Sequence, residues 1–223
     1  MRFRFLPKAH TFFIRKGQKK LNIWHDIDPH LITPECFTAV IEIPKGSKKK
    51  YELDKRTGLL RLDRILYTST HYPANYGFIP RTYADDGDPL DVLVLCSETL
   101  DPSIMVQCYP VGVVRMDDGG HCDDKIIAVV EHDPTWNFYQ EYGELPPHIG
   151  NEIAHFLEVY KQLEGRTTAI SEVYGRRAAV KIIDECMERY LVHFCGKRPE
   201  LDKHLTEDGP LDLRIPEEEA CRE

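Results

Sequence analysis

Three aspartates that lie within six residues, directly ahead of an apolar run, form the stretch of this chain best suited to chemistry. They are Asp86, Asp88 and Asp91, and residues 92–95 (Val-Leu-Val-Leu) follow at once. Carboxylates this close repel one another unless a cation lies between them. Carboxylate oxygens suit hard cations, and the absence of nearby His or Cys favours Mg²⁺ or Mn²⁺ over Zn²⁺. The stretch predicts a metal site, and a solvated acidic turn is the alternative that it leaves open.

A second acidic group precedes another apolar run. Asp118 and Asp123 come shortly before Lys125, which begins the run 125–130 (Lys-Ile-Ile-Ala-Val-Val). Both acidic groups therefore stand on loops at the ends of predicted strands. If those strand ends meet, four or five acids converge on one place, which is enough for two or more divalent ions.

Cations accompany the acids. Lys50 and Arg64 fall within predicted strands, and Lys161 follows Tyr160 on a predicted helix. Because Mg²⁺ is commonly held by one or two carboxylates together with water and substrate phosphates, acids and cations in one pocket indicate phosphoryl transfer. The chain has no Walker A sequence, no G-x-G-x-x-G and no kinase motif to hold a nucleotide. We therefore predict a small substrate that is mostly phosphate, attacked by metal-activated water.

The elements that must position these side chains follow from hydrophobic spacing. Alternation predicts strands, and apolar residues at intervals of three and four predict helices. Strands first and helices last indicate an α+β fold that is mainly β, and a closed barrel of five short antiparallel strands avoids exposed edges. The expected strands are 37–43, 50–53, 59–66, 92–95, 105–116 and 125–130, the first three forming a meander. One expected helix starts at the prolines 146–147 and runs through 163, with Gly165 past its end, and the other covers 179–194. We also expect an aromatic, proline-broken passage at 72–80 and a loop at 117–120.

Composition excludes several classes of protein. The 223-residue chain carries a formal net charge of −8, whereas nucleic-acid binding normally shows as a basic excess. No run approaches the ~18 apolar residues of a membrane span. Seven Cys without a C-x-x-C pair argue against a zinc site, and a reducing, cytoplasmic location fits them best. The first twenty residues are basic and hold no acid, so an organellar transit peptide is the alternative to an arm packed on the domain.

Five segments closely resemble the soluble inorganic pyrophosphatases of family I, in the same order and with matching spacing. The most specific is 86–94 (Asp-Gly-Asp-Pro-Leu-Asp-Val-Leu-Val). The others are 40–44 around Glu42, 50–55, Asp63-Arg64 and 72–77. The likeness continues through 110–113, Asp118, Asp123, Lys125 and 155–161, so it covers roughly residues 37 to 195.

The resemblance implies an OB-type barrel, with added short strands and two C-terminal helices, that hydrolyses pyrophosphate to two orthophosphates. Several Mg²⁺ ions are implied in each site, with Mn²⁺ as the alternative ion. The implied metal ligands are Asp86, Asp91, Asp118, Asp123 and, through water, Glu42, with Asp91 bridging two ions and Glu52 orienting its neighbours. One departure is Gly119, where many members carry an acid, and it bears on the affinity of the outer metal site.

Further roles follow from the same resemblance. Asp88 is the implied general base, and Tyr76 is expected over the metal pair. The implied phosphate-binding residues are Lys50, Arg64, Lys125, Tyr160 and Lys161. Taken singly, these positions have plainer interpretations: a core aromatic for Tyr160 or Tyr76, a solvated lysine for Lys161, and a strand-edge charge for Glu42. For these residues only the family resemblance favours a role in the site over the plainer interpretation.

We expect three parts in the chain: an N-terminal arm over 1–36, the pyrophosphatase barrel over 37–196 and an acidic tail over 197–223. The expected partner is pyrophosphate, with neither nucleic acid nor membrane, and the resemblance implies a homo-oligomer, a hexamer in preference to a dimer. Two other functions stay open. One is a Mg-dependent phosphohydrolase acting on nucleotides or polyphosphate, and the other is a non-enzymatic OB-type barrel that binds single-stranded nucleic acid.

Overall fold

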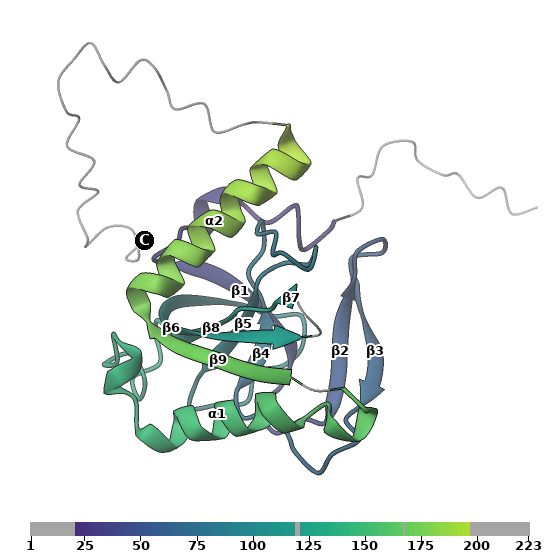
Figure 1. Cartoon of the computed structure of the whole chain (residues 1–223). Coiled ribbons are helices and arrows are strands. Elements are labelled where there is room, and N and C mark those ends of the chain that lie inside the picture. Colours follow the sequence, from purple (N-terminus) through teal and green to yellow (C-terminus); the bar gives the residue numbers. More distant parts are fainter. Residues whose placement is uncertain (1–20, 119–120, 167, 197–223) are drawn as a thin grey trace, which may run out of the picture.

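The computed structural model describes residues 21–118, 121–166 and 168–196, so the expectations for 1–20, Gly119 and the tail 197–223 lie outside these ranges (Figure 1). The strands are β1 (Phe37–Ile43), β2 (Lys49–Asp54), β3 (Leu59–Ile65), β4 (Asn75–Phe78), β5 (Asp91–Leu95), β6 (Met105–Asp118), β7 (His121–Cys122), β8 (Lys125–Val130) and β9 (Thr168–Gly175). The helices are α1 (Pro147–Val159) and α2 (Arg176–Cys195), with 3-10 turns η1 (Pro29–Leu31), η2 (Tyr142–Glu144) and η3 (Gln162–Glu164).

Five strands close into a barrel. The pairings run from β1 to β4, β5, β8 and β6, and β6 pairs with β1 again. This confirms the mainly β, OB-type barrel, but the prediction that all its strands are antiparallel is wrong. β5 and β8 are parallel, with Asp91 opposite Lys125. Directions cannot alternate all the way around a closed ring with an odd number of strands, so at least one neighbouring pair must be parallel.

The predicted meander of the first three strands is also wrong. β2 and β3 form a separate two-stranded sheet, which stands beside the barrel in Figure 1. The barrel neighbours of β1 are instead β4 and β6. Strand spacing finds β2 and β3 correctly but does not tell which strands become neighbours, because pairing partners are chosen by tertiary packing.

Three strands were not expected from the sequence: β4, β9 and the two-residue β7. β4 lies in the proline-broken passage and is buried on both faces, so it shows no alternation. Its Gly77 lies so close to β1 that a Cβ atom there would stand 1.9 Å from the carbonyl oxygen of Val40. β9 pairs with β6 across a register shift between Arg115 and Met116, which disturbs its alternation.

Apolar side chains fill both faces of the central strands. Leu93 and Ile127 belong to a cluster with Phe156 of α1, whereas their neighbours Val92 and Ile126 pack in a second cluster that includes α2. The two helices accordingly lie on opposite sides of the barrel (Figure 1). This double burial explains why β5 and β8 read as uninterrupted apolar runs.

Both expected helices are present, with one boundary changed. α1 begins at Pro147, as the prolines predict, but it ends at Val159. Leu163 belongs to the separate turn η3 and is exposed, so extending the helix to that residue was wrong. Gly165 then reverses the chain with a φ of 71°. In the part of the chain that the structure describes, no helix combines the length and apolarity that crossing a bilayer requires.

Candidate active site

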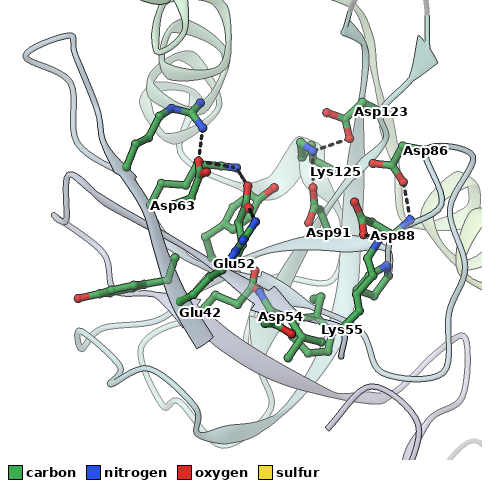
Figure 2. Close-up of a pocket in the computed structure, with 18 of the residues that line it drawn as sticks. Glu42, Glu52, Asp54, Lys55, Asp63, Asp86, Asp88, Asp91, Asp123 and Lys125 are labelled. Atoms are coloured by element: carbon green, nitrogen blue, oxygen red, sulfur yellow. Dashed lines mark hydrogen bonds and ion pairs between the residues drawn. The ribbon is translucent and has the colours of Figure 1, made fainter. Parts of the chain in front are cut away.

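A cavity of about 700 Å³ opens between the barrel and the β2–β3 hairpin, and we call it the charged cavity (Figure 2). Carboxylates and cations make up most of its lining. It brings together every predicted site residue whose side chain is described: Glu42, Lys50, Glu52, Arg64, Tyr76, Asp86, Asp88, Asp91, Asp123, Lys125, Tyr160 and Lys161. The remaining predicted residue, Asp118, ends β6, and its side chain lies outside the described part of the structure.

The parallel pairing of β5 and β8 joins the two acidic groups. Asp91 begins β5, Lys125 begins β8, and the two residues are opposite each other in the register. Asp123 therefore stands beside the loop that carries Asp86 and Asp88. The two acidic strand ends meet, as the predicted metal site requires. The parallel pairing that brings them together is not indicated by the sequence patterns.

Lys125 links the two acidic groups. Its ammonium group is almost completely buried and donates to the carboxylates of Asp91 and Asp123 (Figure 2). Burial acts to lower the pKa of Lys125, but the charges of Asp91 and Asp123 outweigh it and hold the pKa well above its usual value. A permanent cation thus stands between two carboxylates.

The loop that carries the central aspartates is shaped by local hydrogen bonds. The backbone N–H of Asp88 donates to Asp86 Oδ1 at 2.9 Å. Ala84 N–H donates to the carbonyl oxygen of Asp88 at 2.8 Å, and Gly87 adopts a φ of 82°, which favours glycine. The loop turns back on itself and presents Asp86 and Asp88 to the same cavity.

The carboxylates of the cavity repel one another. Burial raises the pKa of Asp86, and the charges of Asp91, Asp88 and Asp123 add to the rise. Burial, reinforced by Asp91, raises the pKa of Glu42 to about 8. The Glu42 carboxyl accepts a hydrogen bond from Leu53 N–H at 2.8 Å.

This donor set suits divalent cations, because it is made of oxygens whose mutual repulsion a cation relieves. Across the described residues, no three His, Cys, Asp or Glu side chains already form a group able to hold a metal ion. The ammonium of Lys125 lies between Asp91 and Asp123 instead. The chemistry of the donors fits a metal, and the side chains would have to move to enclose it.

The β2–β3 hairpin contributes the opposite wall. Lys50 and Arg64 are opposite each other in the hairpin register. Lys50 forms an ion pair with Glu52, and its Nζ lies 3.8 Å from Asp63 Oδ2. Arg64 Nη1 donates to Asp63, and Arg64 Nε donates to Glu164 Oε1 at 2.8 Å. Glu52 thus holds one of the cations expected to bind phosphate.

Tyr76 and Tyr160 are both core aromatics and site residues, so the two interpretations of each tyrosine hold together. Tyr76 and Tyr160 are buried in the cluster around α1, and they also line the charged cavity. Burial, followed by the charge of Asp91, raises the pKa of Tyr76 well above its usual value, so its phenol stays protonated. Lys161 is buried too, with its Nζ 5.2 Å from the centre of the Tyr160 ring. It is therefore not the solvated surface lysine of the plainer interpretation.

Sequence reasoning missed several cavity residues. Lys55 forms an ion pair with Asp88 and donates to the carbonyl oxygen of Gly87 at 3.1 Å. Its Nζ also lies 5.8 Å from the centre of the Trp24 ring. Lys55 belongs to a segment of the family resemblance, which is the only signal that marks it. The other missed residues that carry charge are Asp54, Arg56, Arg61, Asp63 and Arg166.

Comparisons with known proteins agree on one family. The family model described as inorganic pyrophosphatase matches residues 39–191, a span that contains all the predicted site residues. Soluble inorganic pyrophosphatase 2 of Chlamydomonas reinhardtii is 45% identical over 175 residues, which are 78% of this chain and 91% of that protein. Soluble inorganic pyrophosphatase 1 of Arabidopsis thaliana is 46% identical over 75% of this chain and 79% of its own length.

Solved structures give the same result. The crystal structure of inorganic pyrophosphatase from Thermus thermophilus is similar with a TM-score of 0.68 and 41% identity, over 70% of this chain and 92% of that one. Inorganic pyrophosphatase from Helicobacter pylori is similar with a TM-score of 0.69 and 37% identity, over 77% and 99% of the two chains.

Proposed function

This chain belongs to the inorganic pyrophosphatase family, and we propose that it hydrolyses inorganic pyrophosphate to two orthophosphates in the charged cavity. The observation that carries the proposal is the meeting of Asp86, Asp88, Asp91 and Asp123 with buried and half-buried cations around one cavity of about 700 Å³. Neither alternative function is favoured by the family match, and no cavity residue belongs to a nucleotide-binding motif.

We assign Asp86, Asp91, Asp118 and Asp123 as metal ligands, with Glu42 acting through water. Bound Mg²⁺ ions, or Mn²⁺ as the alternative, would lower the pKa of a coordinated water and neutralise charge on the phosphates. Metal dependence is a property of this family; the preference for Mg²⁺ and the identity of each ligand are our proposals. Burial, together with the neighbouring carboxylates, raises the pKa of Asp86, and a bound cation would relieve both effects.

We assign Asp88 as the general base. Its carboxylate lines the cavity and is about half exposed, which is more than Asp91 or Asp123, so a water molecule reaches it most easily. In the reaction, Asp88 takes a proton from water while the water oxygen forms a bond to one phosphorus atom. The bond from that phosphorus to the bridging oxygen breaks, and the second phosphate leaves with the electron pair.

The cations hold the substrate and stabilise the leaving phosphate. Lys125 keeps its proton, and Tyr76 keeps its phenolic hydrogen because burial raises its pKa. We assign phosphate binding to Lys50, Arg64, Lys125, Tyr160 and Lys161, with Tyr76 as a hydrogen-bond donor above the reacting centre. These groups surround the cavity before substrate arrives.

We also propose a homo-oligomer, a hexamer in preference to a dimer. The exposed apolar residues Leu59, Leu62 and Ile65 on β3 support a contact between subunits. A cytoplasmic location is proposed from the sequence, whose seven Cys include no C-x-x-C pair. The catalytic domain is proposed to span 37–196, between the arm 1–36 and the tail 197–223.

The proposed function is tested by phosphate release. The full-length protein is assayed with pyrophosphate, tripolyphosphate and ATP at equal concentrations, each with Mg²⁺ and with EDTA. We expect rapid release from pyrophosphate with Mg²⁺, much slower release from the other two substrates, and none with EDTA. Equal rates on the three substrates would refute the assignment.

A further inference from the structure

Glu164 reaches a phosphate-binding arginine from a distant part of the chain. Its Oε1 accepts a hydrogen bond from Arg64 Nε at 2.8 Å, across 100 residues of sequence. Only 11% of the Glu164 side chain and 22% of the Arg64 side chain are exposed. Glu164 ends η3, the turn that follows Lys161, so its position is set by the same segment that presents Tyr160 and Lys161.

The nitrogens of Arg64 are used unequally. Nε donates to Glu164 and Nη1 donates to Asp63. Nη2 is buried and has no hydrogen-bond partner within the described ranges. A guanidinium group is planar, with its N–H groups in a rigid fork, so fixing Nε and Nη1 also fixes the direction of Nη2. A buried donor without a partner is costly, so the contacts of Nε and Nη1 with the two carboxylates must hold the guanidinium group where it lies.

Asp63 does not orient the arginine by itself. It is the chain neighbour of Arg64, and its carboxylate also lies 3.8 Å from Lys50 Nζ. Glu164 is the less exposed of the two carboxylates and comes from another element. Its contact with Arg64 therefore fixes the β2–β3 wall of the charged cavity relative to the segment that follows α1.

We propose that Glu164 is a positioning residue, which holds the guanidinium group of Arg64 in place at the wall of the charged cavity so that it can bind a phosphate oxygen of pyrophosphate. The inference rests on the proposed function, in which Arg64 binds phosphate. Glu164 acts through Arg64 and does not itself touch the substrate, in keeping with its absence from the cavity lining.

The test compares Glu164→Ala and Glu164→Gln with the control Glu158→Ala, whose carboxylate is exposed on α1. Each variant is assayed for kcat and KM with pyrophosphate and Mg²⁺, and its thermal unfolding is recorded. We expect Glu164→Ala to raise KM about tenfold, equivalent to about 1.4 kcal/mol of binding free energy, with a smaller effect on kcat. Glu164→Gln keeps an acceptor for Nε and should recover most of the loss. Glu158→Ala should match the wild type.

A double-variant comparison separates positioning from a general effect on folding. If Glu164 acts through Arg64, adding Glu164→Ala to Arg64→Ala should leave KM within about twofold of the single Arg64 variant. If Glu164→Ala does not fold, Glu164→Asp takes its place, and its shorter reach should raise KM above that of Glu164→Gln.

Two results would overturn the inference. One is an unchanged KM in the Glu164 variants, and the other is a KM in the double variant that has risen by the product of the increases in the two single variants. A wild type without pyrophosphatase activity, or an Arg64→Ala variant with normal KM, would instead show that the proposed function or the role of Arg64 is wrong.

Discussion

Replacing Lys125 with Met should destabilise the protein in a way that divalent cations partly reverse. The side chain of Lys125 is 3% exposed, and its ammonium group donates to Asp91 and Asp123, whose side chains are 25% and 14% exposed. Met keeps most of the side-chain volume but removes the charge, so the variant leaves two carboxylates facing each other without a cation. Divalent ions that bind these carboxylates supply the missing charge.

The expected magnitude follows from the burial of the three groups. Removing one partner from a buried ion pair costs about 3–5 kcal/mol. Because Asp91 is a quarter exposed, we expect the lower end, about 3 kcal/mol. For a chain of this size, each kcal/mol shifts Tm by about 2–4 °C. Lys125→Met should therefore lower Tm by about 6–12 °C in EDTA, and by distinctly less in Mg²⁺.

The measurement is thermal unfolding followed by circular dichroism at pH 7.5, in EDTA and in Mg²⁺. Lys181→Met is the matched control, because Lys181 is 76% exposed and lies 3.6 Å from Glu185 on the surface of α2. An exposed pair of this kind contributes about 0.3–0.5 kcal/mol, so the control should shift Tm by less than about 2 °C in both conditions. Equal losses for Lys125→Met with and without Mg²⁺ would refute the idea that cations take over the role of Lys125. A loss as small as that of the control would refute the buried ion pair.

Three further changes test other parts of the site and the fold. Asp88→Asn should lower kcat by about 10²–10⁴-fold, because it removes the general base, while Mg²⁺ binding measured by calorimetry stays nearly intact; normal turnover would remove Asp88 from its role. Lys55→Met should lower kcat about threefold to tenfold with little change in Tm, because its half-exposed ion pair with Asp88 contributes little stability but orients the base; an unchanged kcat would contradict this. The third change concerns Asp133. Burial acts to raise the pKa of Asp133, but hydrogen bonds from two backbone N–H groups outweigh it and lower the pKa to about 2. Because the pKa is lower in the folded state, the ionised carboxylate stabilises the folded protein at pH values above the unfolded pKa of about 4. This stabilisation is lost as the pH falls through about 2. Asp133→Asn should therefore cost about 1–2 kcal/mol in urea unfolding at pH 7 and progressively less below pH 4; a loss independent of pH would show that the charge is not responsible.

A cation site and most of the secondary-structure elements can be predicted from the sequence alone. The spacing of Asp86, Asp88 and Asp91 ahead of an apolar run predicts a cation site, because carboxylates that close need one. Alternation and helical spacing predict six of the strands and both helices, since these periods are local properties of the chain. The family resemblance adds Glu42, Tyr76 and Tyr160, whose local patterns are equally those of core or edge residues.

Which elements become neighbours is seen only in the folded chain. The parallel pair of β5 and β8 follows from closing an odd number of strands, and no local period encodes it. β4 was missed because a strand buried on both faces does not alternate, and its Gly77 is needed by a contact with Val40 more than thirty residues away.

The contacts that complete the site are non-local for the same reason. Lys55 meets the loop of Asp88 across 32 residues, and Glu164 meets Arg64 across 100. Each of these charged side chains looks in the sequence like an ordinary surface residue. Barrel closure and the turn after α1 bring each side chain to its partner. An ion pair depends on distance in space, so it leaves no periodic pattern along the sequence.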